Sequence, residues 1–258
     1  MFRVLPLLPW EAKRRRAARL RAREIMLLIV SRVRARVAES SALHALNRLG
    51  LSDDELCNEV LTLLIAGHHT TGSTIAWVLH HIADDLALAN ELRHEAELAS
   101  GPVGEIGPAG VKGAELSAAF VRETLRLYPA AWWFAREARQ TIELGGVRLA
   151  PGSWLIISPW RLHRDQRFWE EPKVFKVDRD FSNRAYLPFG AGPRTCVGMG
   201  LALLELQLVA LEFAAAFRMN SSASGKMPTP IASVTLIPPR IDITVELASS
   251  DLSKREAA

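Results

Sequence analysis

Residues 189–198, FGAGPRTCVG, place one cysteine, Cys196, among three glycines and two residues after Arg194. Glycine permits backbone conformations and close approaches that a Cβ atom forbids. The apolar run 199–216 follows directly and predicts a helix, whose first N–H groups point back toward this loop. A thiolate is stabilised at the start of a helix, and thiolate is the form of cysteine that binds metal. The stretch therefore predicts a cysteine held by a glycine-rich loop as a metal ligand.

The same ten residues resemble the haem-binding signature of the cytochrome P-450 family, the haem-thiolate monooxygenases. An isolated glycine pattern of this kind has a simpler interpretation, a tight turn with a buried structural cysteine. The resemblance implies a bound haem b (iron protoporphyrin IX) with the thiolate of Cys196 as axial iron ligand. It also implies that Phe189, Gly190 and Gly198 form the haem-contacting loop and that Arg194 meets a haem carboxylate.

The composition is that of an ordinary globular protein, with 258 residues, 49% hydrophobic and 23% charged. The two cysteines do not form the disulfide framework of a secreted domain, and Cys57 is most simply a small buried apolar residue. We expect that no apolar run approaches the length needed to span a bilayer, and we find no signal-peptide pattern. These features predict a cytoplasmic protein without a transmembrane segment.

Basic residues cluster over residues 13–23 and 32–36, within a net charge of +4. Such a cluster is compatible with binding to nucleic acid or to an anionic membrane surface. Apolar residues recur between the charges at helical spacing, which favours an amphipathic helix with a solvated basic face. These residues are Met26, Ile29, Val30, Val33 and Val37. No aromatic residues are interleaved with the charges, so we predict no nucleic-acid partner.

Capping and periodicity predict a mainly α protein of the α+β class. Ser52 and Glu55 form a capping box that begins a long helix. Its buried stripe is expected to contain Leu56, Val60, Leu63, Leu64, Thr71, Ile75, Val78 and Ile82. Further helices are expected over 86–99, 114–127 and 199–217, and a loop over 100–113. Strands are expected over 141–144, 147–149 and 153–158, and a terminal hairpin over 234–237 and 241–247.

Glu123 and Arg126 lie three residues apart, on one face of the helix expected over 114–127. Alone, such a pair is a surface ion pair of little energetic value. Its place before the cysteine loop resembles the buried Glu-x-x-Arg pair of the cytochrome P-450 family. The resemblance implies a third member, Arg179 in the segment 175–179, and a structural role for this triad.

The sequence Ala-Gly-His-His-Thr-Thr at 66–71 lies within the long helix. Its hydroxyl groups are compatible with simple bonding back to helix carbonyls. The family resemblance instead implies a groove that receives dioxygen, with Thr70 as its catalytic hydroxyl. His69 stands where the family usually has Asp or Glu, and histidine can relay protons near neutral pH.

Two further residues, Arg136 and His163, resemble the family's contacts to the haem carboxylates, together with Arg194. The alternative is that they are exposed charges flanking a sheet. By the same resemblance the aromatic segment 132–134 lines the substrate pocket, which implies an apolar substrate or a narrowed cavity.

The resemblance covers residues 51–247 and implies the C-terminal portion of the family's fold, without its N-terminal helices. We expect one partial domain over 1–258, with segments 1–50, 51–217 and 218–258. The implied function is insertion of one atom of dioxygen into an apolar small molecule. Electrons would come from a separate ferredoxin or flavin reductase, because no flavin or iron–sulfur motif is present. The alternatives are a truncated or degenerate haem-binding remnant, and a basic helical module whose nucleic-acid binding falls steeply with salt.

Overall fold

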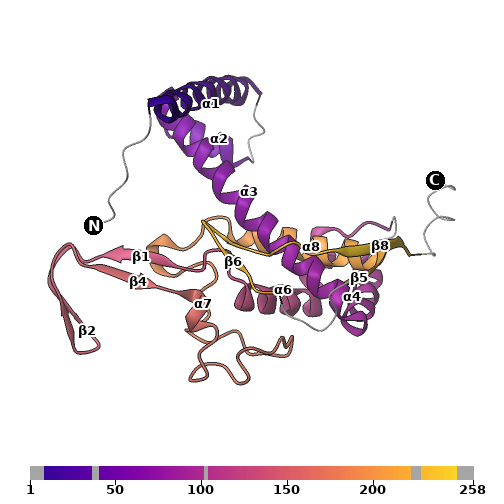
Figure 1. Ribbon diagram of the computed structural model, residues 1–258. Helices are drawn as coiled ribbons and strands as arrows, with labels where there is room; N and C mark the ends of the chain where they lie inside the picture. Colours follow the sequence, from indigo (N-terminus) through magenta and orange to yellow (C-terminus); the bar gives the residue numbers. More distant parts are fainter. Residues whose placement is uncertain (1–8, 37–40, 102–103, 222–227, 249–258) are drawn as a thin grey trace. The chain divides into compact units, whose positions relative to one another are not determined.

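The computed structural model describes residues 9–36, 41–101, 104–221 and 228–248 (Figure 1). The chain divides into two compact units, 1–68 and 69–258, and each is described by itself. Helices dominate both units, and the strands form small two-stranded antiparallel sheets. This architecture confirms the predicted fold class.

The first unit contains α1 (Pro9–Arg36), α2 (Ala42–Asn47) and the beginning of α3 (Asp53–Asp84). Its buried cluster consists of Met26, Val30, Leu56, Cys57 and Val60. The helical spacing of the apolar residues in α1 is confirmed at Met26 and Val30. The side chain of Val33 and all of Val37 lie outside the described residues. On the basic face, Arg23 and Arg34 pair with Asp54 and Asp53, each at 2.7 Å.

Helix α3 begins with the predicted capping box. The backbone N–H of Ser52 donates to Glu55 Oε2 at 2.9 Å, and the Glu55 N–H donates to Ser52 Oγ at 3.4 Å. The predicted stripe is buried near both ends of the helix, whereas Leu63 and Leu64 are 39% and 50% exposed. The prediction is wrong at these two residues. In the described part of the chain, the buried clusters include residues of α3 only toward its two ends.

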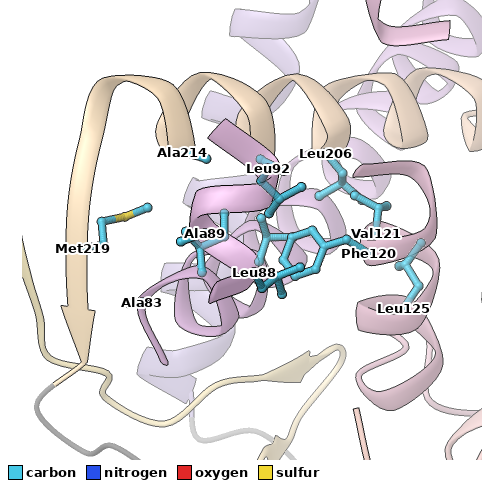
Figure 2. Packing of buried hydrophobic residues seen from close by; sticks show 13 residues of the cluster. Ala83, Leu88, Ala89, Leu92, Phe120, Val121, Leu125, Leu206, Ala214 and Met219 are labelled. Carbon is cyan, nitrogen blue, oxygen red and sulfur yellow. The ribbon is translucent and has the colours of Figure 1, made fainter. Parts of the chain in front are cut away.

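Three helices of the second unit, α4 (Leu86–Ala99), α6 (Glu115–Leu127) and α8 (Met199–Ala216), surround its main core (Figure 2). Their buried side chains include Leu92, Phe120 and Leu206. Both carboxylate oxygens of Glu95 on α4 accept hydrogen bonds from the first turn of α6, at 2.7 Å each. A side chain of α4 therefore caps the helix that carries Glu123 and Arg126.

Helix α8 has the length and apolar composition of a membrane-spanning helix, although 22% of its residues are buried inside the structure. The expectation that no apolar run approaches the length of a membrane span is therefore wrong at residues 199–216. The same helix contributes four buried residues to the core, namely Leu206, Ala210, Leu211 and Ala214. A core helix meets the same criteria, so the absence of a transmembrane segment stays a prediction.

The segment 100–113 is not entirely the loop that its glycines suggested, because it contains a short helix, α5 (Pro108–Gly113). Val111 is buried in a cluster with Ala96 and Leu211. At Gly110 a Cβ atom would lie 2.1 Å from the carbonyl oxygen of Ala99. This glycine therefore permits close packing of α5 against the end of α4.

A two-stranded sheet precedes the cysteine loop, formed by β1 (Phe134–Glu137) and β4 (Trp154–Ile157). Strand β1 was not predicted, because Phe134 was interpreted as part of a pocket-lining linker and Arg136 as a haem-carboxylate contact. Between its strands, β2 (Ile142–Leu144) and β3 (Val147–Leu149) form the predicted hairpin. Its turn residues, Gly145 and Gly146, have φ of +57° and +77°, the conformation that a type I′ turn requires.

The terminal hairpin was predicted with the wrong partners. Strand β8 (Ile243–Leu247) pairs with β5 (Phe217–Ser221), and β6 (Ile231–Ala232) pairs with β7 (Leu236–Ile237). Phe217, expected to end the last helix, is extended at φ −130° and ψ 149° and begins β5. Strong β pairing across distant segments is invisible to local periodicity, which explains the error.

Candidate functional site

The cysteine loop is closed by its own backbone. Gly190 and Gly192 have φ of +71° and +74°, and the short 3-10 helix η1 covers Gly192–Arg194. The Cys196 N–H donates to the carbonyl oxygen of Phe189 at 2.9 Å. Left-handed backbone favours glycine, so these two glycines set the turn that brings Cys196 back beside Phe189.

Cys196 is a free, exposed cysteine three residues before the first residue of α8. Two apolar side chains that follow Cys196 in the sequence are also exposed, Val197 at 91% and Leu201 at 61%. Phe189, at the other end of the loop, packs against the main core. A Cβ atom at Gly198 would lie 3.9 Å from the Cys196 sulfur, in ordinary contact. The loop is anchored inward by Phe189 and presents a thiol flanked by exposed apolar side chains.

The structure brings Glu123, Arg126 and Arg179 together in the interior. The Arg126 guanidinium donates to both carboxylate oxygens of Glu123, at 2.6 and 2.7 Å, and both side chains are fully buried. Arg179 Nε donates to Glu123 Oε1 at 3.0 Å, and so does the Lys176 N–H at 2.9 Å. This arrangement has the geometry of a structural triad, because the Glu123–Arg126 pair is buried and has a third member, unlike an i,i+3 pair on the surface.

The two arginines also bind the backbone that leads to the cysteine loop. Arg126 donates to the carbonyl oxygens of His163, Pro172 and Val174. Arg179 donates to those of Glu170, Glu171 and Val174. All five N–H groups of Arg126 are thereby used, which is why only arginine suits this position. The triad therefore also binds the backbone of the segment 163–174.

The ring of His163 is bonded to backbone in the interior of the second unit. His163 ends the short helix α7 (Pro159–Leu162) and is fully buried. Its Nδ1 is 2.9 Å from the carbonyl oxygen of Arg126, and its Nε2 accepts the Leu187 N–H at 2.8 Å. Burial lowers the pKa of His163 to about 4, so the ring is neutral. The structure corrects the predicted role, because both ring nitrogens are already bound to backbone.

Arg136 and Arg194, the other two predicted carboxylate contacts, are exposed. Arg136 lies on β1, with its guanidinium over the Phe134 ring at 4.9 Å, and Arg194 ends η1. Both guanidinium groups remain accessible to an anionic ligand.

The aromatic segment 132–134 does not form a continuous pocket lining. Trp132 packs beside Trp77 and Tyr128 and donates its indole N–H to the Ser233 carbonyl at 3.0 Å. Phe134 is part of β1, and Trp133 alone of the three is strongly exposed, at 46%. The inference of an apolar substrate therefore depends on Trp133 within this segment.

Thr70 and His69 lie in an unbroken stretch of α3. The Ser73 hydroxyl donates to the His69 carbonyl at 2.7 Å, and the Thr74 hydroxyl donates to the Thr70 carbonyl at 3.0 Å. The side chain of His69 is exposed and that of Thr70 is half-buried. The hydroxyl-to-carbonyl bonding that the sequence suggested is present at Ser73 and Thr74. The catalytic roles of Thr70 and His69 stay a prediction.

Sequence reasoning missed several residues that fix the site. Tyr186 donates its hydroxyl to the Arg122 carbonyl at 3.0 Å, and Glu95 caps α6. Burial raises the pKa of Tyr186. A side chain that bonds to distant backbone leaves no periodic trace, so no sequence signal marked Tyr186. In the nearby run 163–165 only His163 was assigned a role, as a haem-carboxylate contact, and the structure bonds its ring to backbone.

Comparison with known proteins identifies the family. The family model described as cytochrome P-450 matches residues 11–245. The chain is 36% identical over 201 residues to cyclooctatin synthase of Streptomyces melanosporofaciens, covering 74% of this chain and 43% of that protein. It is 32% identical over 206 residues to thromboxane-A synthase of Mus musculus, covering 76% and 38%. It is 28% identical over 206 residues to cytochrome P-450 3A27 of Oncorhynchus mykiss, covering 77% and 40%.

The chain therefore belongs to the cytochrome P-450 family. It spans about two fifths of the length of these curated relatives.

The residues around Cys196 fit the haem that this family uses. Among the described residues, no group of three or more His, Cys, Asp and Glu side chains could hold a bare metal ion. A single accessible thiol suits a metal that arrives already bound in a macrocycle. The side chains of Val197 and Leu201, which follow Cys196 in the sequence, are apolar and exposed. The exposed guanidinium groups of Arg194 and of Arg136 on β1 suit carboxylates.

Proposed function

We propose that this chain is the haem-binding portion of a monooxygenase, in which Cys196 would bind the haem iron. The observation that carries the proposal is the exposed, free thiol on a loop that is closed by the Cys196–Phe189 backbone bond. A thiolate ligand increases electron density at haem iron and favours cleavage of the O–O bond. Haem supplies the oxygen and electron chemistry when bound, and the chain supplies ligand, orientation and protons.

The described residues have distinct parts in this proposal. Cys196 binds the iron, and Arg136 and Arg194 bind the two carboxylates of the macrocycle. Thr70 supplies a hydroxyl for dioxygen, and the exposed imidazole of His69 relays protons from solvent. The bound haem would supply insertion of one oxygen atom into an apolar substrate and release of the other as water, with two protons and with two electrons from a ferredoxin or flavin reductase. Membership of the cytochrome P-450 family supports oxidation as the reaction class, and two relatives are named as synthases, of cyclooctatin and of thromboxane-A.

The test is reconstitution of the full chain with haem, followed by spectroscopy of the ferrous–CO complex. A formed site gives the long-wavelength Soret band that a thiolate ligand produces. Cys196→Ala should abolish this band, because no other thiol lies in the loop. Cys57→Ala is the matched control, since Cys57 is the second free cysteine but is buried in the first unit.

Two results would contradict the proposal. Haem uptake that is unchanged in Cys196→Ala would show that another group binds the iron. No haem uptake by the unaltered chain would remove the monooxygenase function from the isolated polypeptide.

A second candidate is a haem-binding remnant without activity as an isolated chain. It is supported by the exposure of three consecutive apolar residues on α3, Leu63, Leu64 and Ile65, at 39%, 50% and 62%. Exposed apolar surface of this kind marks a missing partner or an aggregation hazard. A thiolate-type spectrum without substrate oxidation, in the presence of a competent electron donor, would favour this candidate.

A further inference from the structure

His163 joins two elements that carry the proposed site. Its Nδ1 lies 2.9 Å from the carbonyl oxygen of Arg126, near the C-terminal end of α6. Its Nε2 lies 2.8 Å from the backbone nitrogen of Leu187, just before the cysteine loop. The imidazole thus spans the gap between the triad helix and the entry to the loop.

The direction of both hydrogen bonds follows from the donors. The Leu187 N–H can only donate, so Nε2 accepts and carries no hydrogen. The hydrogen of the neutral ring is then on Nδ1, where it donates to the Arg126 carbonyl. The ring is fully buried and packs against Tyr186, with ring centroids 5.5 Å apart. Loss of the imidazole would therefore leave the Leu187 N–H and the buried Arg126 carbonyl without this partner.

From Leu187 the connection continues to the thiol through backbone alone. The Leu187 carbonyl accepts the Gly190 N–H at 3.2 Å, and the Phe189 carbonyl accepts the Cys196 N–H at 2.9 Å. His163 therefore links this series of backbone bonds to α6 directly at the Leu187 N–H, whereas the Tyr186 hydroxyl reaches α6 from the preceding residue. The Arg126 and Arg179 guanidinium groups bind the earlier segment 163–174, so they do not duplicate this link.

We propose that His163 is a positioning residue, which sets the backbone of the cysteine loop so that Cys196 presents its sulfur as a thiolate ligand. This inference deepens the proposed function and rests on it for the identity of the ligand. The link from Arg126 through His163 to Leu187 belongs to the chain itself and can be tested without haem.

Three variants separate positioning from general stability. His163→Phe keeps a buried ring and loses both hydrogen bonds. His163→Gln returns an amide that can accept the Leu187 N–H and donate to the Arg126 carbonyl. Tyr186→Phe is the matched control, because it removes a different hydrogen bond between α6 and the same segment, one residue before Leu187.

The first readout is amide hydrogen exchange of the full chain without haem. In His163→Phe, exchange of the Leu187, Gly190 and Cys196 amides should rise about tenfold, the effect of losing one buried hydrogen bond. His163→Gln should restore most of the protection, and Tyr186→Phe should leave these three amides unchanged. The second readout is the ferrous–CO Soret band, which should shift toward the short-wavelength, non-thiolate form in His163→Phe only.

Three outcomes would overturn the inference. The first is a His163→Phe variant that loses stability but keeps both the loop protection and the thiolate band. The second is a Tyr186→Phe variant that changes the loop as much as His163→Phe does. The third applies if His163→Phe does not fold: it is a His163→Gln variant that folds but whose loop amides are unprotected. Failure of the unaltered chain to bind haem would refute the proposed function, while the exchange experiment would still decide the role of His163.

Discussion

The Glu123 carboxylate binds residues that are distant from it in the sequence, in addition to its near neighbour Arg126. Its carboxylate accepts four hydrogen bonds, from two guanidinium groups and one backbone N–H. Charges that are removed from water require this degree of pairing, since burying an unpaired charge is expensive. The carboxylate is therefore the group around which the segment 163–179 is ordered.

Glu123→Gln should lower the free energy of unfolding by about 3–5 kcal/mol, because Arg126 and Arg179 would remain buried without their counter-charge. Denaturant unfolding followed by circular dichroism measures this change. Arg240→Ala is the control, since it removes an exposed pair with Asp242 and should have little effect. Equal effects of the two substitutions would show that the triad contributes no more than a surface ion pair.

The buried imidazole of His163 predicts an acid-sensitive stability. Burial lowers its pKa from 6.5 to about 4, with smaller lowering effects from the charges of Arg126 and Arg164. The unfolded chain therefore binds this proton more readily, so stability is full above about pH 6.5 and falls as the pH drops through about 4. The contribution amounts to about 3 kcal/mol at most.

The measurement is the free energy of unfolding against pH for the unaltered chain and for His163→Gln. The variant should lose part of the decline between pH 6.5 and 4, although His81, whose burial lowers its pKa to about 3, contributes to the same window. Parallel pH profiles for the two proteins would contradict the assignment.

Some residues of the candidate site could be predicted from the sequence, and others could not. Cys196 and the Glu123–Arg126 pair were identified because their neighbours along the chain form a local pattern. His163 was predicted to contact a haem carboxylate, whereas in the structure its ring is bonded to backbone. Its partners, Arg126 and Leu187, are 37 and 24 residues away, and only the fold brings their backbone groups to the ring.

At the scale of elements, α5 packs on α4 at a distance that only glycine permits. The Cβ of alanine at position 110 would meet the Ala99 carbonyl oxygen at 2.1 Å, whereas at Gly113 it would meet nothing within 4 Å. Both residues belong to α5, so they form a matched pair.

Gly110→Ala should destabilise the chain by about 1–3 kcal/mol, because the backbone of α5 or α4 must shift. Gly113→Ala should be neutral or slightly stabilising, since alanine favours helix. Thermal unfolding of both variants measures the difference. A neutral Gly110→Ala would show that α5 can move away from α4 at no cost.

The elements that sequence predicted well are those with local causes. The bounds of α4 agree with the prediction, and the two-glycine turn between β2 and β3 has the required positive φ values. The errors concern elements whose partners are remote. Strand β5 pairs with β8 rather than continuing α8, and β1 is defined by its pairing with β4. Periodicity records which residues are apolar and does not record which strand lies beside them.

At the scale of the whole molecule, the chain is two compact units, and the proposed haem ligands all belong to residues 69–258. A ligand that binds only the folded state stabilises what it contacts, by about 2.7 kcal/mol at a hundred times its dissociation constant. Cys196, Arg136 and Arg194 lie in the second unit, as does Thr70. The first unit holds α1 and the pairs that Arg23 and Arg34 make with α3.

Haem should therefore raise the unfolding temperature of the full chain in a concentration-dependent way. Amide hydrogen exchange, compared with and without haem, should show new protection around residues 189–202 and around Arg136. Protection should be small over residues 9–36, whose amides lie outside the unit that carries the ligands. Cys196→Ala should weaken the effect strongly, whereas Cys57→Ala should preserve it. Protection confined to α1, or equal in both variants, would mean that haem binds this chain by its apolar surface and not through Cys196.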